Sequence, residues 1–495
     1  MAFLAFVICP LSVVLKKDLT SKTTNKEKQM NRRDFIKTGA VAAVAAAAQG
    51  VNAQGAAREI KVAVVGCGGR GTGGGYKQIS EQDFYRQGAL GNLLQAAKIL
   101  REQGVNVTVK PVAFADYFLE KAQGAAKKFG VDEKFAFGGA NGYKQIMAMP
   151  EVDVVILTTP LNFRPRHTMA AIQAGKHVFA EKGVAVDGPG VRLMIEASKL
   201  AEQKHLTIVC GTQRRHQKGY RMVKKALDEG KLGTILGGEV YWNGRVPWVR
   251  ARQPGQTNKD YLCNNWLNFA ELSGDHICEQ HVHNIDVANW FLGRYPKSVV
   301  AFGARSRRVS GNQYDCFSGD FDYGDGVHIH SMCRQVEACA SNVSELFRTE
   351  KAVLTGTTAK TPDGKRIELD EANFRGESPY VVEHIDMLKS ILGCGPYYNE
   401  GEACAISTAC GVMIRISAYT GQMVALNQLL SNEKSPWYNF ACTPTPEDFE
   451  KEGDVPMPAV GDNEWSLPGK PWRDLPKGTP TSDKATQDAP LGYRV

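Results

Sequence analysis

Short apolar runs alternate with longer helical patterns through the first half of the chain. The run 60–65 is rich in β-branched residues, as in a strand that is buried on both faces. Further strands are predicted over 107–114, 152–158, 177–180 and 207–210, and helices over 93–101, 118–129, 166–174 and 191–203. Because strands and helices alternate, the pattern predicts an α/β fold with a parallel, doubly wound sheet. We expect this first domain to span 58–215.

The periodicity changes after about residue 216. A strand is predicted over 235–242 and a strong amphipathic helix over 276–292. Period-two alternation then predicts strands over 298–306, 316–323, 327–334 and 346–355, and late helices follow over 380–392 and 402–429. Neighbouring strands of this kind predict an antiparallel sheet with helices on one face. We expect this second domain to span 216–430 and an extended tail to span 431–495.

The N-terminus has the features of a targeting segment. Arg32 and Arg33 begin a twin-arginine pattern, an alanine-rich run follows, and a small-residue cleavage site ends at Ala53. We therefore predict a leader over 1–53, with Met30 as an alternative start, and export by the twin-arginine translocase. No lipidation cysteine stands beside the cleavage site, so the expected product is soluble and periplasmic, without a stable membrane anchor.

Charge and cysteine content narrow the function classes. The formal net charge is +8, but residues 1–53 carry eight Lys and Arg against three Asp and Glu. The remainder is nearly balanced and has no basic stripe, so no nucleic-acid partner is predicted. The cysteines are scattered, with no C-x-x-C pair, which is typical of buried thiols rather than of a disulfide framework.

A glycine-rich turn follows the first predicted strand. It runs Gly66-Cys67-Gly68-Gly69-Arg70-Gly71, which is G-x-G-x-x-G in the context that a Rossmann dinucleotide site requires. The glycines allow a tight turn, close approach of backbone to a pyrophosphate, and helix–strand packing. Asp116 ends the second strand and is expected to bind the adenosine ribose, which favours NAD, with NADP possible. Asp116 lies farther along the chain from the glycine-rich turn than is usual for this acidic residue. An insertion between about 80 and 103 would explain the extra length.

A set of later motifs resembles the Gfo/Idh/MocA (glucose–fructose oxidoreductase/inositol dehydrogenase) family. The motifs are Thr159-Pro160, His167, Ala174-Gly175-Lys176-His177-Val178, Glu181-Lys182, Gly211-Thr212-Gln213-Arg214 and Glu279-Gln280-His281-Val282-His283-Asn284-Ile285-Asp286. The resemblance covers roughly residues 60–425. It implies an N-terminal Rossmann domain, then a domain with a large open, mainly antiparallel sheet, and a homodimer or homotetramer.

The same resemblance implies a catalytic set of Lys182, Glu279 and His283. Oxidation of an alcohol needs a base for the hydroxyl proton, and a lysine beside the nicotinamide can serve. On one helix, Glu279 and His283 would share a face and could pass a proton. Two departures stand out: Gly183 replaces the family's proline, which would loosen the turn that aims Lys182, and Glu279 replaces an aspartate.

Further contacts are expected around these residues. Cofactor contacts are predicted for Gly66, Gly68, Gly69, Arg70, Gly71, Asp116, Thr159, Pro160, Asn162, His167, Glu181, Lys182 and Gln213. Substrate contacts are predicted for Arg214, Arg215, Trp248, Trp266 and His283. The two arginines follow the fifth strand, at the carboxyl edge where such sheets bind ligands, and the tryptophans could stack on a sugar ring.

The histidines also raise the question of a metal. His276, His281 and His283 lie close in sequence to Asp275 and Glu279. Histidines two apart on a helix point to different faces, so we predict no metal site. His328 and His330 would share one face of a strand. That face could belong to the sheet surface, the substrate pocket or a subunit contact, and the sequence leaves these open.

The function predicted from these features is hydride transfer. The substrate would be a sugar, polyol or glycoside hydroxyl, and the cofactor a tightly held NAD(P). One alternative is a redox-neutral, NAD-dependent glycosidase that works by oxidation, elimination, hydration and reduction; the Glu279 and His283 motif does not resemble that of such glycosidases. Another is a non-catalytic dinucleotide-containing binding protein, against which the presence of Lys182 with His283 argues.

Overall fold

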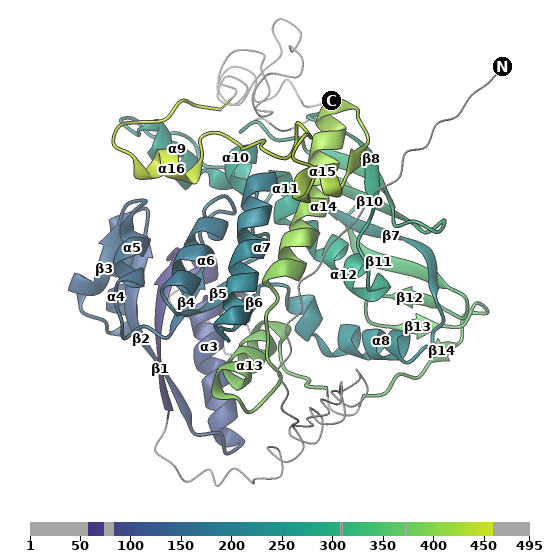
Figure 1. Cartoon of the computed structure of the whole chain (residues 1–495), viewed down its shortest axis with the longest axis horizontal. Coiled ribbons are helices and arrows are strands. Elements are labelled where there is room, and N and C mark those ends of the chain that lie inside the picture. Colours follow the sequence, from purple (N-terminus) through teal and green to yellow (C-terminus); the bar gives the residue numbers. More distant parts are fainter. Residues whose placement is uncertain (1–57, 74–83, 307, 309, 372–373, 459–495) are drawn as a thin grey trace, which may run out of the picture. The chain divides into compact units, whose positions relative to one another are not determined.

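The computed structural model describes residues 58–73, 84–306, 308, 310–371 and 374–458, so the predicted leader and the last residues of the tail lie outside the described part. The first sheet is entirely parallel (Figure 1). Its strands, in spatial order, are β3 (Ala136–Gly138), β2 (Val107–Asp116), β1 (Arg58–Val65), β4 (Val154–Leu157), β5 (His177–Ala180) and β6 (Ile208–Cys210).

Helices cover both faces of this sheet. They are α3 (Phe84–Glu102), α4 (Leu119–Phe129), α5 (Gly142–Met147), α6 (Arg164–Gln173) and α7 (Gly188–Gln203). Along β1, Val62 and Val64 pack into one core cluster, while Ala63 and Val65 pack into the other. A strand that is buried on both faces has no polar side to show, which explains the apolar pattern of residues 60–65.

The second sheet is mixed and mostly antiparallel. Its order is β14 (Arg366–Ile367), β13 (Ala359–Lys360), β12 (Val353–Thr355), β11 (Asn342–Thr349), β7 (Ile235–Gly244), β10 (His328–Gln335), β9 (Cys316–Asp322), β8 (Ser298–Ala304) and β15 (Val424–Ala425). Only β7 and β10 pair in parallel among these strands. The predicted fold class is therefore confirmed.

Three helices from the second half of the chain pack between the two sheets or against the first domain. Helix α14 (Gly401–Thr420) packs against α7 on one side and strand β8 on the other, α12 (Val282–Leu292) packs against α14, and α13 (Pro379–Leu392) packs against α3 (Figure 1). Helix α14 is long and apolar enough to cross a membrane by composition alone, yet 83% of its apolar window is buried inside the fold. It is therefore a core helix of this protein.

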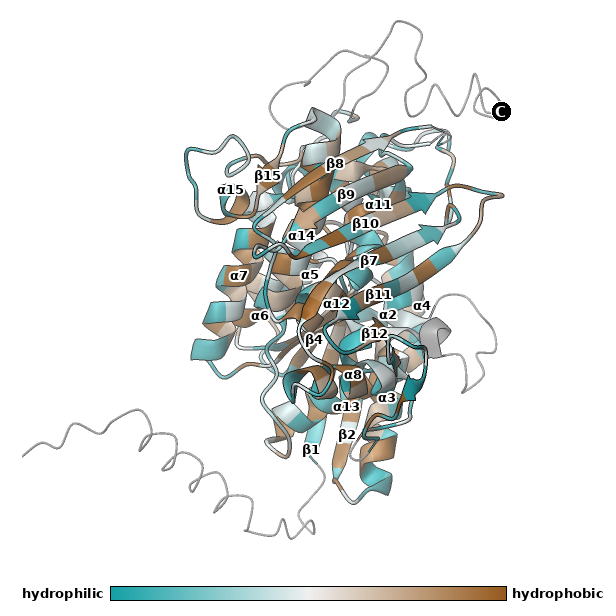
Figure 2. Cartoon of the chain, turned by 90° about the vertical axis from the view of Figure 1, so that its right-hand side faces the viewer, coloured by the Kyte–Doolittle hydropathy of each residue, from teal (hydrophilic) through white to brown (hydrophobic). Residues whose placement is uncertain are grey.

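One face of the second sheet is open to solvent. Figure 2 looks onto β8, β9, β10, β7 and β11 lying side by side. On β8, Val299 and Ala301 are buried toward α14, whereas Val300 and Phe302 point away and are 56% and 73% exposed. An exposed phenylalanine next to an exposed valine is an unusual feature for a surface that meets only water.

Three predicted elements are interrupted. The helix expected over 276–292 is two helices, α11 (Asp275–Glu279) and α12, because the backbone leaves the helix at Gln280. The strand expected over 346–355 is a hairpin that turns at Glu350 and Lys351. The helix expected over 402–429 ends at Thr420, where Gly421 caps it with φ 72°.

The region after residue 430 is more ordered than an extended tail. It follows α15 (Asn427–Leu430), contains α16 (Pro446–Glu450), and buries Phe440, Cys442 and Phe449. The prediction of an extended surface tail is therefore wrong for residues 431–458. Sequence reasoning also missed β3 and α5 of the first sheet, which are short.

Candidate active site

The glycine-rich turn joins β1 to the short helix α2 (Gly69–Thr72). Gly66 has φ +98°, and a Cβ there would lie 2.7 Å from the carbonyl carbon of Thr158. A Cβ at Gly71 would lie 2.1 Å from the Gly66 carbonyl oxygen. By contrast, a Cβ at Gly68 or Gly69 would meet nothing within 4 Å. The first and last glycines thus serve internal packing, and the middle two face open space where a ligand can approach the backbone.

Asp116 closes the turn at the end of β2. Its carboxylate accepts the Cys67 backbone N–H at 2.7 Å and the Phe118 N–H at 3.0 Å. Burial raises the pKa of Asp116, while nearby Lys121 and the two N–H donors act in the opposite direction. Helix α3 (Phe84–Glu102) occupies most of the interval 80–103 in which the insertion before Asp116 was expected.

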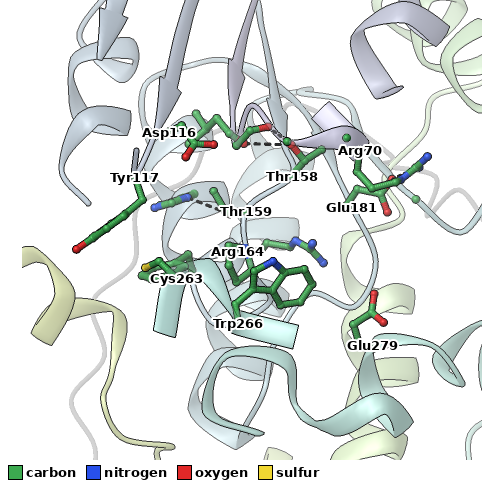
Figure 3. A pocket seen from close by; sticks show the side chains of 18 of the residues that line it. Arg70, Asp116, Tyr117, Thr158, Thr159, Arg164, Glu181, Cys263, Trp266 and Glu279 are labelled. Carbon is green, nitrogen blue, oxygen red and sulfur yellow. Dashed lines mark hydrogen bonds and ion pairs between the residues drawn. The ribbon is translucent and has the colours of Figure 1, made fainter. Parts of the chain in front are cut away.

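A cavity of about 940 Å³ runs from this turn to the second sheet. Figure 3 shows Asp116 and Tyr117 at one end, Glu279 at the other, and Arg164 and Trp266 between them. The predicted site residues that line it are Gly66, Gly68, Gly69, Arg70, Asp116, Thr159, Pro160, His167, Glu181, Lys182, Gln213, Trp248, Trp266, Glu279 and His283. Most of the predicted cofactor set and all of the predicted catalytic set therefore share one cavity.

Lys182 follows β5 and reaches across to the second domain. Its Nζ donates to a carboxylate oxygen of Glu279 at 2.9 Å and also to the Glu279 main-chain carbonyl. That carbonyl is available because the break at Gln280 interrupts the helix: the His283 N–H bonds the Gln280 carbonyl instead. The interruption that sequence analysis missed is thus what gives the lysine its acceptor.

Gly183 stands where the family has proline, and the turn is not loose. The Lys182 and Gly183 carbonyls both accept from the buried Arg164 guanidinium, the latter at 2.6 Å. A Cβ at Gly183 would lie 2.8 Å from the Cys278 carbonyl oxygen. The close approach of α11 therefore requires a small residue here, and Arg164 fixes the turn. Burial lowers the pKa of Arg164 to about 10.

Arg70 and Glu181 form a second ion pair in the cavity. The Arg70 Nε donates to Glu181 at 3.0 Å, and the guanidinium lies over the Tyr380 ring, 5.1 Å from its centroid. Burial opposes ionisation of Glu181, but the charges of Arg70, Lys182 and Arg164 outweigh it, so the Glu181 pKa is lowered. The carboxylate is therefore ionised and able to accept hydrogen bonds from a ligand.

His283 lies on α12 and Glu279 ends α11, but both residues line the same cavity. Its ring stacks on Trp242, with centroids 5.6 Å apart and an interplanar angle of 23°. Burial, and then the positive charges of Lys182, Arg214 and Arg70, hold the His283 pKa well below its usual value. The imidazole is therefore neutral, with one ring nitrogen free to accept a hydrogen bond and the other able to donate one.

This neutral state predicts a pH effect on stability. As pH falls below about 6.5, the unfolded chain binds a proton at His283 that the folded protein refuses, so stability is lost toward acid pH. We expect the difference in unfolding free energy between wild type and His283→Asn to shrink as pH falls from 7 to 5, by up to about 1.4 kcal/mol per pH unit. Urea unfolding at several pH values measures it. A constant difference would mean that His283 titrates normally.

Four predicted site residues do not line the cavity. The half-buried Arg215 guanidinium makes two bonds of 2.8 Å to Asp286, and Arg214 pairs with Glu345. These pairs leave the predicted substrate role of both arginines without support. Gly71 packs behind the turn, and Asn162 is buried with no hydrogen-bond partner for its amide among the described residues.

Other cavity residues carried no sequence signal. Arg164, Tyr143, Phe163 and Tyr380 line the cavity, but each lies within a helix or at its start, in a pattern that any core helix shows. Trp242, on β7, also lines the cavity, and its only sequence signal is its position beside Tyr241. A buried arginine such as Arg164 is exceptional, yet the sequence alone does not show whether an arginine is buried.

The remaining histidines are engaged elsewhere. His281 Nε2 lies 2.8 Å from the Ser331 hydroxyl, and His276 Nε2 lies 3.1 Å from the Cys333 sulfur. Within the described residues no cluster of three or more His, Cys, Asp or Glu could hold a metal ion. His328 pairs with Asp320 at 2.7 Å on the exposed sheet face, and neither it nor His330 lines the cavity.

Two models of known protein families match this chain, one over each of its two domains. Residues 60–212 match the oxidoreductase family with an NAD-binding Rossmann fold, and residues 220–360 match the GFO/IDH/MocA C-terminal domain. Residues 29–48, which lie outside the described part, match the twin-arginine translocation pathway signal sequence.

Curated relatives match over part of their length. Inositol 2-dehydrogenase of Salmonella typhimurium is 28% identical over 199 residues, which are 40% of this chain and 51% of the relative. The 1,5-anhydro-D-fructose reductase of Ensifer adhaerens is 25% identical over 292 residues, 56% of this chain and 81% of the relative. The chain thus spans about half the length of the first of these relatives.

Solved structures share the fold. Aldose-aldose oxidoreductase from Caulobacter crescentus, in complex with glycerol, gives a TM-score of 0.55 at 16% identity and covers 74% of this chain and 100% of its own. A levoglucosan dehydrogenase in complex with NADH and levoglucosan gives a TM-score of 0.56 at 15% identity, covering 74% and 100%. At this identity the likeness concerns the fold.

Proposed function

Since this chain belongs to the Gfo/Idh/MocA oxidoreductase family, we propose that it transfers a hydride between a hydroxyl of a sugar, polyol or glycoside and a tightly held nicotinamide dinucleotide. The observation that carries the proposal is the position of Lys182. Its Nζ is held by Glu279 in the same cavity that the glycine-rich turn lines. A proton-transfer group and a dinucleotide cradle thus share one enclosure.

The cavity residues fit a dinucleotide. The backbone at Gly68 and Gly69 faces open space, so a pyrophosphate can approach it, and Asp116 stands at the same end. A carboxylate there would accept the adenosine ribose hydroxyls and repel a 2′-phosphate, which supports NAD over NADP. Glu181, ionised beside Arg70, offers a second acceptor farther along the cavity.

The catalytic proposal assigns a role to each of three side chains. A bound nicotinamide would supply the hydride acceptor. Lys182 takes the hydroxyl proton, because its Nζ lies in the cavity beside the second domain and is fixed by two acceptors on Glu279. Glu279 orients that amine, and neutral His283 on the neighbouring wall holds the substrate hydroxyl or relays the proton. Trp242, Trp248 and Trp266 provide apolar surfaces of the kind on which sugar rings stack.

The proposal also covers the roles of the two domains, the oligomeric state and the location of the protein. Residues 58–215 hold the cofactor, and 216–430 supply the substrate side. The exposed Val300 and Phe302 on the open sheet face support a homo-oligomer that buries them. The twin-arginine signal supports export as a folded, cofactor-loaded protein to the periplasm, as a soluble product. Because the periplasm offers no evident pool of soluble dinucleotide, a trapped cofactor would be re-oxidised in place, either by a second substrate or within one catalytic cycle.

The proposal is tested on the mature form, from Gln54 onward, expressed with its leader. We expect absorbance and fluorescence of the released ligand to identify NAD. Hexoses and aryl glycosides are then added while the reduced nicotinamide signal is followed. Lasting reduction supports the dehydrogenase. Aglycone release without lasting reduction would establish the redox-neutral glycosidase instead, and NAD without any turnover would indicate a binding protein.

A further inference from the structure

The segment 445–457, called the C-terminal strap here, lies beyond the two matched family regions, which end at residue 360. It begins with Thr445, which caps α16 in a capping box with Asp448. A helix of one turn has little stability of its own, so its order comes from what it contacts. Those contacts reach the two opposite walls of the cavity.

The first anchor is Glu450, at the end of α16. Its carboxylate accepts from the Tyr143 hydroxyl at 3.0 Å, from Lys144 Nζ at 2.7 Å, and from Arg166 Nε and Nη2 at 2.6 and 2.9 Å. The side chain is only 10% exposed. These three donors lie on α5 and α6 of the cofactor domain, so one carboxylate joins both helices.

These helices form the cavity wall at the end near Asp116. Tyr143, Phe163 and His167 all line the cavity, and the Tyr143 ring lies on the His167 ring with centroids 4.1 Å apart. Phe449 of the strap is buried against Phe163, edge to face at 5.2 Å. The strap therefore lies directly behind side chains that would touch the adenosine half of a dinucleotide.

The second anchor is on the other domain. The Asp454 carboxylate accepts the backbone N–H groups of Asn258 and Lys259 at 2.8 and 2.9 Å, at the start of α9 (Asn258–Asn264). Lys259 Nζ in turn donates to the strap carbonyl of Lys451 at 2.6 Å. At its other end, α9 supplies Cys263 and Asn264 to the cavity lining.

The two walls also meet directly. The hydroxyl of Tyr117, next to Asp116 on the cofactor domain, donates to Asp260 of α9 at 2.9 Å. A single hydrogen bond between two half-buried side chains contributes little, whereas the strap adds several charge-assisted bonds and a buried aromatic side chain. The adenosine end of the cavity is thus closed by two domains that the strap holds together.

We propose that Glu450 and Asp454 are positioning residues that retain the dinucleotide, by keeping α9 against the α5–α6 wall so that the cofactor leaves only when the strap detaches. This inference rests on the proposed function, since it presumes a bound dinucleotide. It gives a physical reason for a tightly held cofactor, and it locates that property in a segment outside the catalytic set.

The test uses the full mature chain and the variant Glu450→Gln, with Glu452→Gln as the control. Glu452 is exposed and lies two residues from Glu450, and its replacement by glutamine removes the same charge. NAD bound to each protein is exchanged against excess fluorescent etheno-NAD. We expect exchange to be at least about tenfold faster in Glu450→Gln, equivalent to about 1.4 kcal/mol, and unchanged in Glu452→Gln. The KM for added NAD should rise while kcat at saturating NAD is kept.

Asp454→Asn tests the other anchor and stands alone if Glu450→Gln does not fold. Faster exchange with unchanged kcat in either anchor variant supports the proposal. Exchange at the wild-type rate in both overturns it, as does a loss of kcat that added NAD fails to restore. If wild type binds no dinucleotide at all, the proposed function fails instead, and the two failures are distinct.

Discussion

Replacing Lys182 with methionine is expected to lower turnover about 10²–10⁴-fold, the usual contribution of a general base, while the dinucleotide stays bound. Methionine keeps the unbranched shape and most of the length of the side chain but cannot carry the proton. Lys182 Nζ is the amine that Glu279 holds in the cavity, and the glycine-rich turn does not depend on it. Steady-state kinetics with a sugar that reduces the wild type, together with NAD content, measures both effects.

The matched control is Lys121→Met. Lys121 lines the same cavity, but at the Asp116 end, where it is exposed and far along the chain from the catalytic set. We expect turnover of the NAD-loaded control to stay near wild type. If Lys182→Met keeps more than a tenth of wild-type turnover, the proton passes to another group, and His283 becomes the first candidate.

The fold was predictable because its strongest signals are local. The apolar run of β1 followed by a glycine turn, and the alternation of strands with helices, require only that a parallel sheet be buried on both faces. The strand His177–Ala180 was predicted with its exact bounds. The short β3 and α5 were missed, since a strand of three residues has too few positions to show a period.

The site was harder to predict where long-range contacts decide the geometry. The break at Gln280 follows no glycine or proline; it exists where the Lys182 amine takes the Glu279 carbonyl out of the helix. Likewise, Arg215 looks like a ligand-binding residue at a strand end, and its partner Asp286 lies 71 positions away. A sequence shows the charge of a residue but not the partner that neutralises it.

At Gly183, too, long-range contacts decide a geometry that the sequence did not predict. Against the family pattern, a glycine in place of proline predicts a looser turn. In the structure the carbonyl of Cys278 approaches so closely that a side chain would clash, and Arg164 ties the turn from the other side. The substitution and the buried arginine are therefore parts of one arrangement, which could not be inferred from either residue alone.

The glycine-rich turn gives the second large prediction, because its glycines serve different purposes. Gly71→Ala would place a Cβ 2.1 Å from the Gly66 carbonyl oxygen and 2.6 Å from the Thr158 hydroxyl. Neither the backbone nor the strand end can yield easily, so we expect a loss of about 1–3 kcal/mol in unfolding free energy and the loss of dinucleotide binding. Urea unfolding of the NAD-free protein and an NAD titration measure the two effects.

Gly68→Ala separates packing from binding. No protein atom lies within 4 Å of the new Cβ, so the unfolding free energy of the NAD-free protein should stay within about 0.5 kcal/mol of wild type. The NAD affinity should nevertheless fall, because a pyrophosphate that approaches the Gly68 backbone would meet the methyl group. If Gly68→Ala binds NAD as tightly as wild type does, the phosphates do not rest on this turn. In that case the open space in front of Gly68 and Gly69 belongs to another part of the ligand.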